Sequence, residues 1–325
     1  MLTLLSLNCP QCSAPLPRAA RWRTVNCTYC GATIVRGAET VERATFRMAW
    51  QRSNSAPAEG RELVWRGARY GLLAPLGTGD SAELWLARRC GALPERVTLK
   101  LALNEQAARD RLLAEAAALE ALQRLATPGA AYFTRRLPQP LGTGVADGLA
   151  GGTRTALLLR HPAGFWGSLA EVRLLNPQGI DPRHGVWLWR RMLEVLAFVH
   201  DNGWVHGALT PEHALVHPRD HGVLLIGWAG AHQPPARDRS AAVARDLMQS
   251  AWTIRALLAG HAADAPGPGA RTPAPMAALL RQCSEDAAAC AQFGARGLEQ
   301  ALSTAAREAF GPPQFIPFHP APQGA

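Results

Sequence analysis

Four cysteines near the N-terminus have the spacing of a metal site. They form two pairs with two residues inside each pair and 14 residues between the pairs: Cys9, Cys12, Cys27 and Cys30. Four thiolates bind zinc tetrahedrally and leave no open coordination position. The sequence therefore predicts a structural zinc ion, Zn2+, rather than a catalytic one. The other cysteines are scattered, unlike a secreted disulfide framework: Cys90, Cys283 and Cys290.

A second group of residues has the chemistry of a phosphate site. Lys100 is the only lysine of the chain, in a sequence whose other basic residues are all arginine. Its compact ammonium fits between phosphates and a carboxylate better than a guanidinium would. The turn formed by Gly77 and Gly79 lets backbone N–H groups approach phosphates. Lys100 and the two glycines are therefore candidates for a phosphate site.

Several motifs of the chain together resemble protein kinases. The Gly-rich loop matches Leu76-Gly77-Thr78-Gly79-Asp80-Ser81-Ala82-Glu83-Leu84, although Ala82 stands at the third glycine. The strand with the phosphate-pairing lysine matches Val97-Thr98-Leu99-Lys100, and the helical glutamate that pairs with this lysine matches Glu115. The resemblance implies a weak ATP site at Gly77, Gly79, Lys100 and Glu115, and the alternative is that Lys100 and Glu115 form an ion pair that only supports the fold. The catalytic loop matches the segment from His206 to Val216, and the Asp-Phe-Gly motif matches Gly227-Trp228-Ala229. The cysteine pairs likewise resemble zinc ribbons.

The resemblance implies a scaffold that has lost its catalytic groups. Ala208 occupies the position of the catalytic aspartate, and His213 that of the metal-binding asparagine. Gly227 occupies the position of the magnesium-binding aspartate. Asp246 matches the buried aspartate that supports the catalytic loop, and Leu119, His206 and Trp228 would stack through the core. The sequence is thus similar to a degenerate pseudokinase of the serine/threonine-kinase type, in which bound ATP would not need Mg2+.

The expected fold class is α+β, with a bilobal kinase-like domain behind the ribbon. The segments are a zinc ribbon at 1–37, a linker at 38–65, a β-rich N-lobe at 66–160, a mainly helical C-lobe at 161–310 and a Pro-rich tail at 311–325. Sequence patterns predict strands within 70–103 and at 155–160 and 223–226, and helices at 104–125, 187–201, 242–258, 276–287 and 295–310. A Pro/Gly/Ala-rich stretch covers 261–275.

Composition restricts the function classes. The chain of 325 residues is 48% apolar, and it has neither an apolar run long enough to cross a bilayer nor a secretory leader. We therefore expect a bacterial-type cytoplasmic protein without a membrane partner. The net charge of +9 comes from arginine and by itself says little about nucleic acid.

Three functions fit these patterns. The first is a pseudokinase without enzymatic activity that acts as a regulatory or scaffold protein, with the ribbon and the kinase-like domain both docking unidentified protein partners. The second is an atypical phosphotransferase with residual ATP binding. The third is a nucleic-acid-binding regulator led by the zinc ribbon, in which strongly salt-dependent binding would be expected.

Overall fold

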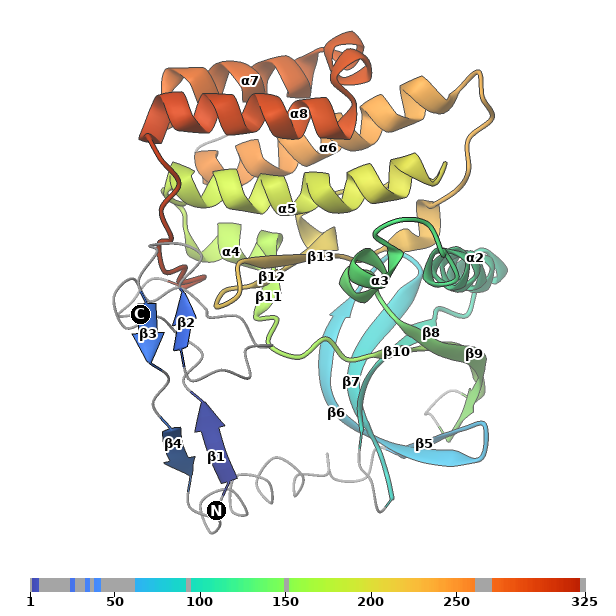
Figure 1. Cartoon of the computed structure of the whole chain (residues 1–325). Coiled ribbons are helices and arrows are strands. Elements are labelled where there is room, and N and C mark those ends of the chain that lie inside the picture. The colour runs from blue at the N-terminus through green and yellow to red at the C-terminus, as the bar shows by residue number, and fades with distance from the viewer. Residues whose placement is uncertain are drawn as a thin grey trace. The chain divides into compact units, whose positions relative to one another are not determined.

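The computed structural model describes residues 62–91, 95–148, 152–260 and 271–321, and near the N-terminus the backbone of four short strands at 2–5, 24–26, 33–35 and 38–41. Its strands and helices confirm the α+β class (Figure 1). The chain forms two compact units. A barrel unit comprises residues 46–163 and 227–232, and a helical unit comprises residues 1–45, 164–226 and 233–325.

The barrel unit is built around six antiparallel strands that close on themselves in the order β10-β8-β7-β6-β5-β9. The strands are β5 (Glu62–Trp65), β6 (Ala68–Thr78), β7 (Ala82–Arg89), β8 (Arg96–Ala102), β9 (Pro140–Asp147) and β10 (Arg154–Arg160). A two-residue turn joins β5 to β6, and both of its residues have positive φ, 47° at Arg66 and 75° at Gly67. Such turns match the twist of a tight hairpin. Residues 62–65, which the sequence placed in the linker, therefore form a barrel strand.

The barrel interior is apolar. Alternate residues of each strand point inward, so that Leu99 and Leu101 of β8 meet Leu158 of β10 and Leu63 and Trp65 of β5. The opposite face of β8 carries Lys100. Helix α2 (Gln106–Gln123) contacts β8, β9 and β10, and the short helices α3 (Ala130–Phe133), η1 (Thr134–Arg136) and η3 (Trp228–Gly230) complete the unit.

The predicted apolar column falls on both units. Leu119 of α2 and Trp228 of η3 are fully buried, and α2 contacts η3 within the barrel unit. His206 is also fully buried, in the helical unit. The structure thus buries all three side chains, and the elements that carry Leu119 and Trp228 are in contact.

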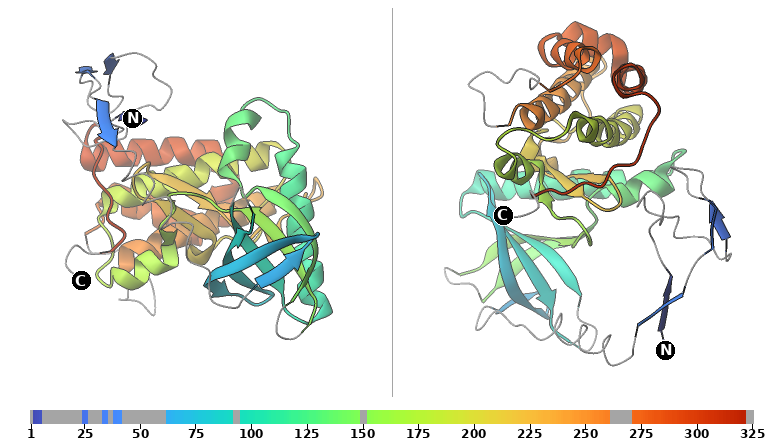
Figure 2. Two further views of the ribbon diagram at one scale, coloured as in Figure 1. Left: turned by 90° about the horizontal axis from the view of Figure 1, so that it is seen from below. Right: turned by 90° about the vertical axis from the view of Figure 1, so that its left-hand side faces the viewer.

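The helical unit packs α-helices beside a small sheet of order β11-β12-β13. Helix α5 contacts α6 and α8, and α7 contacts α6 and α8 (Figure 2). The strands are β11 (Gly167–Ser168), β12 (Ala214–His217) and β13 (Gly222–Leu225), and η2 is Pro211–His213. The helices are α4 (Leu169–Leu175), α5 (Pro182–Asp201), α6 (Arg239–Ala259), α7 (Ala274–Glu285) and α8 (Ala287–Phe310).

Two glycines hold the loop before α5 against the end of α6. Gly179 has φ 75°, and a Cβ there would lie 2.0 Å from the Leu258 carbonyl oxygen. Gly260 has φ 64°, and a Cβ there would lie 2.2 Å from the Pro177 carbonyl oxygen. Both positions therefore exclude any side chain.

Near the N-terminus the described backbone consists of two antiparallel strand pairs. Strand β1 (Leu2–Leu5) pairs with β4 (Ala38–Val41), and β2 (Thr24–Asn26) pairs with β3 (Thr33–Val35). Cys27 and Cys30 fall in the connection between β2 and β3. All four predicted zinc ligands lie outside the described residues.

Five helices predicted from the sequence are confirmed, with shifted ends. Helix α5 begins at Pro182, five residues before the predicted start, and α8 begins at Ala287. Gly294 inside α8 has φ 58° and interrupts the helix, so its second part starts where the sequence predicted. In the described part of the chain, no helix is long and apolar enough to span a membrane.

Candidate functional site

Lys100 and Glu115 form a close ion pair in the barrel unit. Lys100 lies on β8 in register with Leu84 of β7 and Leu157 of β10, and Glu115 extends from α2. The Lys100 Nζ and Glu115 Oε2 atoms are 2.5 Å apart, and the side chains are only 13% and 3% exposed. Burial makes loss of one partner costly, about 3–5 kcal/mol, because the other charge would stay unpaired. The pair therefore fixes α2 to the strand whether or not a nucleotide binds.

The glycine turn is at the junction of β6 and β7. The Gly79 N–H donates to the Ala82 carbonyl at 2.9 Å, which closes the turn. A Cβ on Gly77 would meet no atom within 4 Å, and one on Gly79 would only touch the Ala82 oxygen at 3.9 Å. Packing within the described residues does not require glycine at either position. The turn is therefore open around these two Cα atoms, while the Gly79 N–H is already bonded within the turn.

Arg154 is a residue that the sequence reasoning missed. It begins β10 and pairs with Glu83 of β7 at 3.1 Å. Its guanidinium also donates to the carbonyl groups of Leu101 and Ala102. Glu83 and Arg154 thus close one end of the barrel. Both are charged residues at inward-facing positions of strands whose other inward-facing positions are apolar. This pattern in the sequence could have revealed them.

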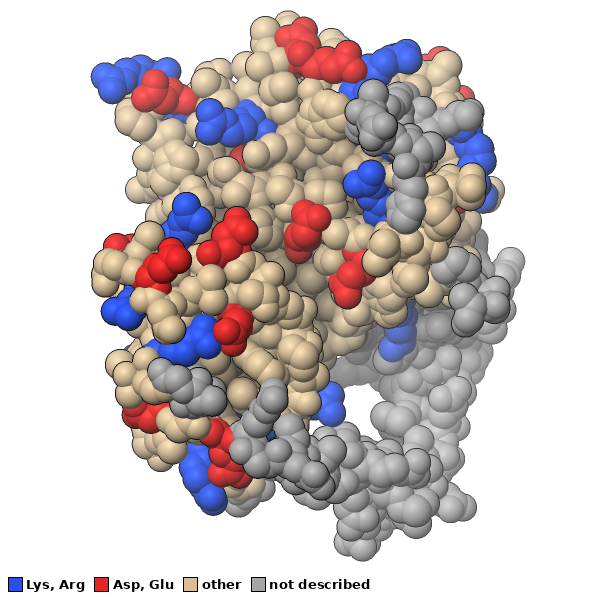
Figure 3. All heavy atoms as spheres, turned by 180° about the vertical axis from the view of Figure 1, so that it is seen from behind, with Lys and Arg blue, Asp and Glu red and all other residues tan. Residues whose placement is uncertain are grey.

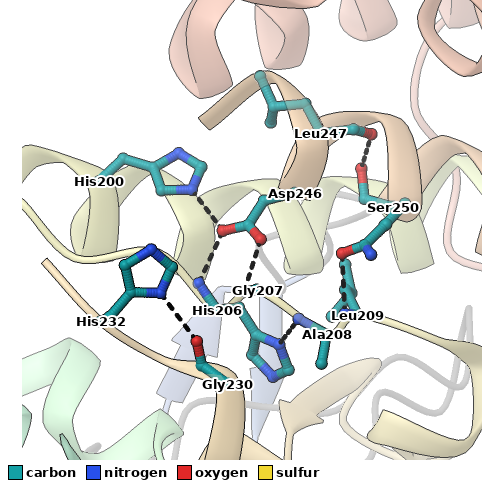
Figure 4. A network of polar contacts seen from close by, with 11 residues as sticks. His200, His206, Gly207, Ala208, Leu209, Gly230, His232, Asp246, Leu247 and Ser250 are labelled. Carbon is teal, nitrogen blue, oxygen red and sulfur yellow. Dashed lines mark hydrogen bonds and ion pairs between the residues drawn. The ribbon is translucent and has the colours of Figure 1, made fainter. Parts of the chain in front are cut away.

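Asp246 organises the loop of the helical unit that carries His206, Ala208 and His213. Its carboxylate accepts hydrogen bonds from the backbone N–H groups of His206 and Gly207, each at 2.8 Å. His200 Nε2 lies 2.9 Å from the same carboxylate. Asp246 comes from α6 and His200 from α5, so the carboxylate ties both helices to the loop (Figure 4). These contacts agree with the prediction that Asp246 is a buried residue that supports this loop.

The hydrogen bonds around Asp246 determine its charge. Complete burial opposes ionisation, but the hydrogen bond and charge of His200 and the hydrogen bond from the His206 N–H together hold the pKa of Asp246 below its usual value. A buried carboxylate is tolerated where donors surround it. Asp246 is therefore an anion at neutral pH.

The two loop histidines, His206 and His213, both bond through ring nitrogens to the backbone of the loop or of the segment beside it. His206 Nδ1 accepts from the Ala208 N–H at 3.3 Å, and Nε2 then donates to the Ile226 carbonyl at 3.0 Å. His213 Nδ1 donates to the Ala208 carbonyl at 2.5 Å. Both rings support the loop backbone, which agrees with the ordinary role of a histidine at such a position.

The contacts of Asp246 hold the loop, and the side chain of Ala208 has no polar group. Ala208 offers only its backbone to His206 and His213, so neither a base nor a metal ligand extends from this position. Gly227 belongs to the barrel unit and has φ 78°, a left-handed conformation that favours glycine. Across the described ranges, no three His, Cys, Asp or Glu side chains gather as a metal site would require.

We predict one zinc ion per chain, bound by the two cysteine pairs. Elemental analysis of the purified full chain should give a ratio near one, because four thiolates form a closed tetrahedral site. Cys27→Ser should lower zinc retention, while Cys90→Ser, which changes a thiol outside the two pairs, should not. Zinc content unaffected by Cys27→Ser would contradict the assignment.

Comparison with family models finds no match to this chain, and no curated protein matches it. Its function has to be inferred from its own residues. The residues on which the inference rests are the Lys100–Glu115 pair, the loop held by Asp246, and Ala208, His213 and Gly227, which the resemblance to protein kinases aligns with acidic and amide groups.

Proposed function

We propose that this protein is a catalytically inactive, cytoplasmic pseudokinase that acts as a regulatory or scaffold protein through protein–protein interaction. The proposed architecture is a β-rich N-lobe containing the barrel, a helical C-lobe and an N-terminal zinc ribbon. Fold resemblance alone does not establish function. The proposal therefore depends on which chemical groups the two units retain and which they lack.

The observation that carries the proposal is the loop held by Asp246. Three donors converge on one fully buried carboxylate, an arrangement that gives the loop a single conformation. In an active phosphotransferase such a loop presents an aspartate to the substrate hydroxyl and an amide to the metal. Here Ala208 and His213 stand at those positions. The contacts of Asp246 that support the loop are kept, while the reactive groups of the loop are replaced. This combination favours a loop that is retained for its structure and not for catalysis.

The zinc ribbon supplies the second part of the proposed scaffold. In sequence, Cys27 and Cys30 lie between the described strands β2 and β3, and two cysteines separated by two residues between paired strands are consistent with the proposed zinc knuckle. On the face drawn in Figure 3, arginines and acidic residues are interspersed. Mixed charge of this kind favours a protein partner over the phosphate backbone of a nucleic acid for that surface.

Nucleotide binding should be weak and independent of magnesium. Lys100 and the turn at Gly77 and Gly79 can meet phosphates, whereas His213 and Gly227 offer no anionic ligand to a divalent cation. In a thermal-shift titration of the full chain, ATP should raise the melting temperature equally with Mg2+ and with EDTA. Lys100→Met should remove the shift, and Arg124→Ala, which changes an exposed i,i+4 ion pair, should keep it.

Two outcomes of this titration are informative. A large ATP shift that requires Mg2+ would contradict the loss of metal ligands. Absence of any shift would mean that Lys100 and Glu115 form only a structural pair, which leaves the scaffold proposal standing.

The scaffold role is tested by affinity purification of the full chain and of the Cys9→Ser/Cys12→Ser variant. A partner that copurifies stoichiometrically with the full chain and is lost from the variant would support docking through the ribbon. Detection of nucleic acid as the retained component, released by raising salt, would instead favour a nucleic-acid-binding regulator.

A further inference from the structure

The chain after α8 returns along the helical unit. This segment, residues 311–321, is called the C-terminal strap. In Figure 1 it is the dark red chain that passes the N-terminal end of α5. Phe318 is only 5% exposed, and Asn176 Nδ2 donates to the Pro320 carbonyl at 2.8 Å. The strap is therefore attached by side-chain burial and by hydrogen bonding, although it forms neither helix nor strand.

The strap covers three rings that we call the aromatic groove: His184 and Trp187 of α5, and His221. The His221 ring stacks on Trp187, with centroids 4.2 Å apart, and on its other side faces Phe315 at 4.4 Å. Phe318 meets the rings of His184 at 4.8 Å and Trp187 at 5.5 Å in edge-to-face geometry. Phe318 thus contacts two rings of the groove, and Phe315 stacks on the third.

The groove requires both imidazoles to be neutral. Trp187 Nε1 donates to His184 Nδ1 at 3.2 Å, so this nitrogen must be unprotonated. His221 Nε2 is buried without a hydrogen-bond partner, so a proton added there would have no acceptor. Burial lowers the pKa of His184 and of His221 to about 4.

Neighbouring groups raise or lower these two pKa values by less than burial does. Asp181 raises the pKa of His184, while Arg183 and His319 lower it. The carbonyl of Ile316 raises the pKa of His221, whereas His184 and Arg191 lower it. Arg191 is itself paired with Glu194 at 2.8 Å.

We propose that the aromatic groove is a peptide-recognition site for extended, proline-containing segments of the pattern Phe-x-Pro-Phe, and that the strap occupies it in cis. The strap supplies this pattern as Phe315-Ile316-Pro317-Phe318. Proline reduces the conformational entropy lost on binding, and aromatic-lined grooves commonly bind such segments. A partner carrying the same pattern would bind when the strap is displaced. The inference goes beyond the scaffold proposal and does not depend on the kinase resemblance.

The full chain carrying Phe315→Ala/Phe318→Ala provides the test, because it frees the groove without truncation. A fluorescein-labelled peptide with the sequence of residues 311–320 is titrated against it by anisotropy. We expect binding in the micromolar range, at least about tenfold tighter than to the wild type, because a tethered strap competes at an effective concentration near millimolar. Adding Trp187→Ala should weaken binding more than tenfold, whereas adding Trp252→Ala, which changes an exposed tryptophan elsewhere, should not.

Several outcomes would overturn the proposal. One is a double variant that melts cooperatively yet binds no peptide at about 1 mM. Another is equal binding of a control peptide in which both phenylalanines are alanine. If the double variant does not fold, Phe318→Ala alone is titrated, and the absence of at least a threefold gain over the wild type would contradict the proposal.

Acidification supplies an independent signature. Since the peptide should bind the neutral rings, its affinity should fall between pH 7.5 and pH 5 as the imidazoles of the freed groove take up protons. An affinity that stays constant over this range would contradict a groove built from His184 and His221.

Discussion

Replacing Asp246 with alanine is expected to lower the free energy of unfolding of the chain by about 3–5 kcal/mol. The substitution removes the acceptor for His200 and for the N–H groups of His206 and Gly207, of which His206 is fully buried and the other two are partly buried. Each buried donor left without a partner costs about 1–3 kcal/mol, although such losses are not additive. Urea denaturation followed by circular dichroism measures the change.

Asp201→Ala is the matched control for Asp246→Ala. Asp201 also pairs with a cation, Arg296, but the two side chains are 50% and 72% exposed. The loss should therefore stay below about 1 kcal/mol. Equal losses in the two variants would contradict the organising role of Asp246.

The contribution of Asp246 to the free energy of unfolding should also decrease as the pH is lowered. Its pKa in the folded chain is lower than the usual value near 3.8, so the folded state favours the anion. The stabilisation is fully present above the unfolded pKa and is lost as pH falls through the folded one. Asp246→Asn should flatten this part of the acid-denaturation profile, and an unchanged profile would show that Asp246 does not contribute.

Amphipathic helices were predictable because their signal is local. Ala/Leu/Glu periodicity identified α2 to within a few residues, and apolar runs located α6 and the second part of α8. The start of α5 was predicted too late although its signals were present, since Asp181 caps the helix and Pro182 occupies its first turn. A capping box at Ser168 and Glu171 likewise marks α4.

The strands that close the barrel were harder to predict. Strand β9 contains Pro140, Gly142 and Gly144, residues that are uncommon in strands. Gly144 is needed because a Cβ there would lie 2.9 Å from Trp65 Nε1. Such a constraint arises from a contact between distant parts of the chain, so no local pattern of the sequence contains it.

The residues of the candidate site also divide into those that the sequence predicted and those that it did not. Lys100 was singled out as the only lysine and Glu115 by the resemblance, and the structure joins them directly. The aromatic groove was not predicted, because His184 and His221 are far apart in sequence and meet the strap only after α5 and the small sheet have packed. The phenylalanines in a Pro-rich tail were the only available signal.

The most direct test of the pseudokinase proposal is a phosphotransfer assay on the full chain. Active kinases turn over roughly 1–100 times per second. Ala208 cannot accept a proton from a hydroxyl, and Gly227 cannot hold the magnesium that neutralises charge on the phosphates, so turnover should lie below detection. Ala208→Asp alone should not restore activity, because the metal ligand at Gly227 would still be missing.

The measurement uses labelled ATP with Mg2+ or Mn2+ and generic protein and small-molecule acceptors, and Lys100→Ala controls for contaminating kinases. The proposal predicts that wild type and Lys100→Ala give the same background label. Transfer of label by the wild type that disappears in Lys100→Ala would contradict it.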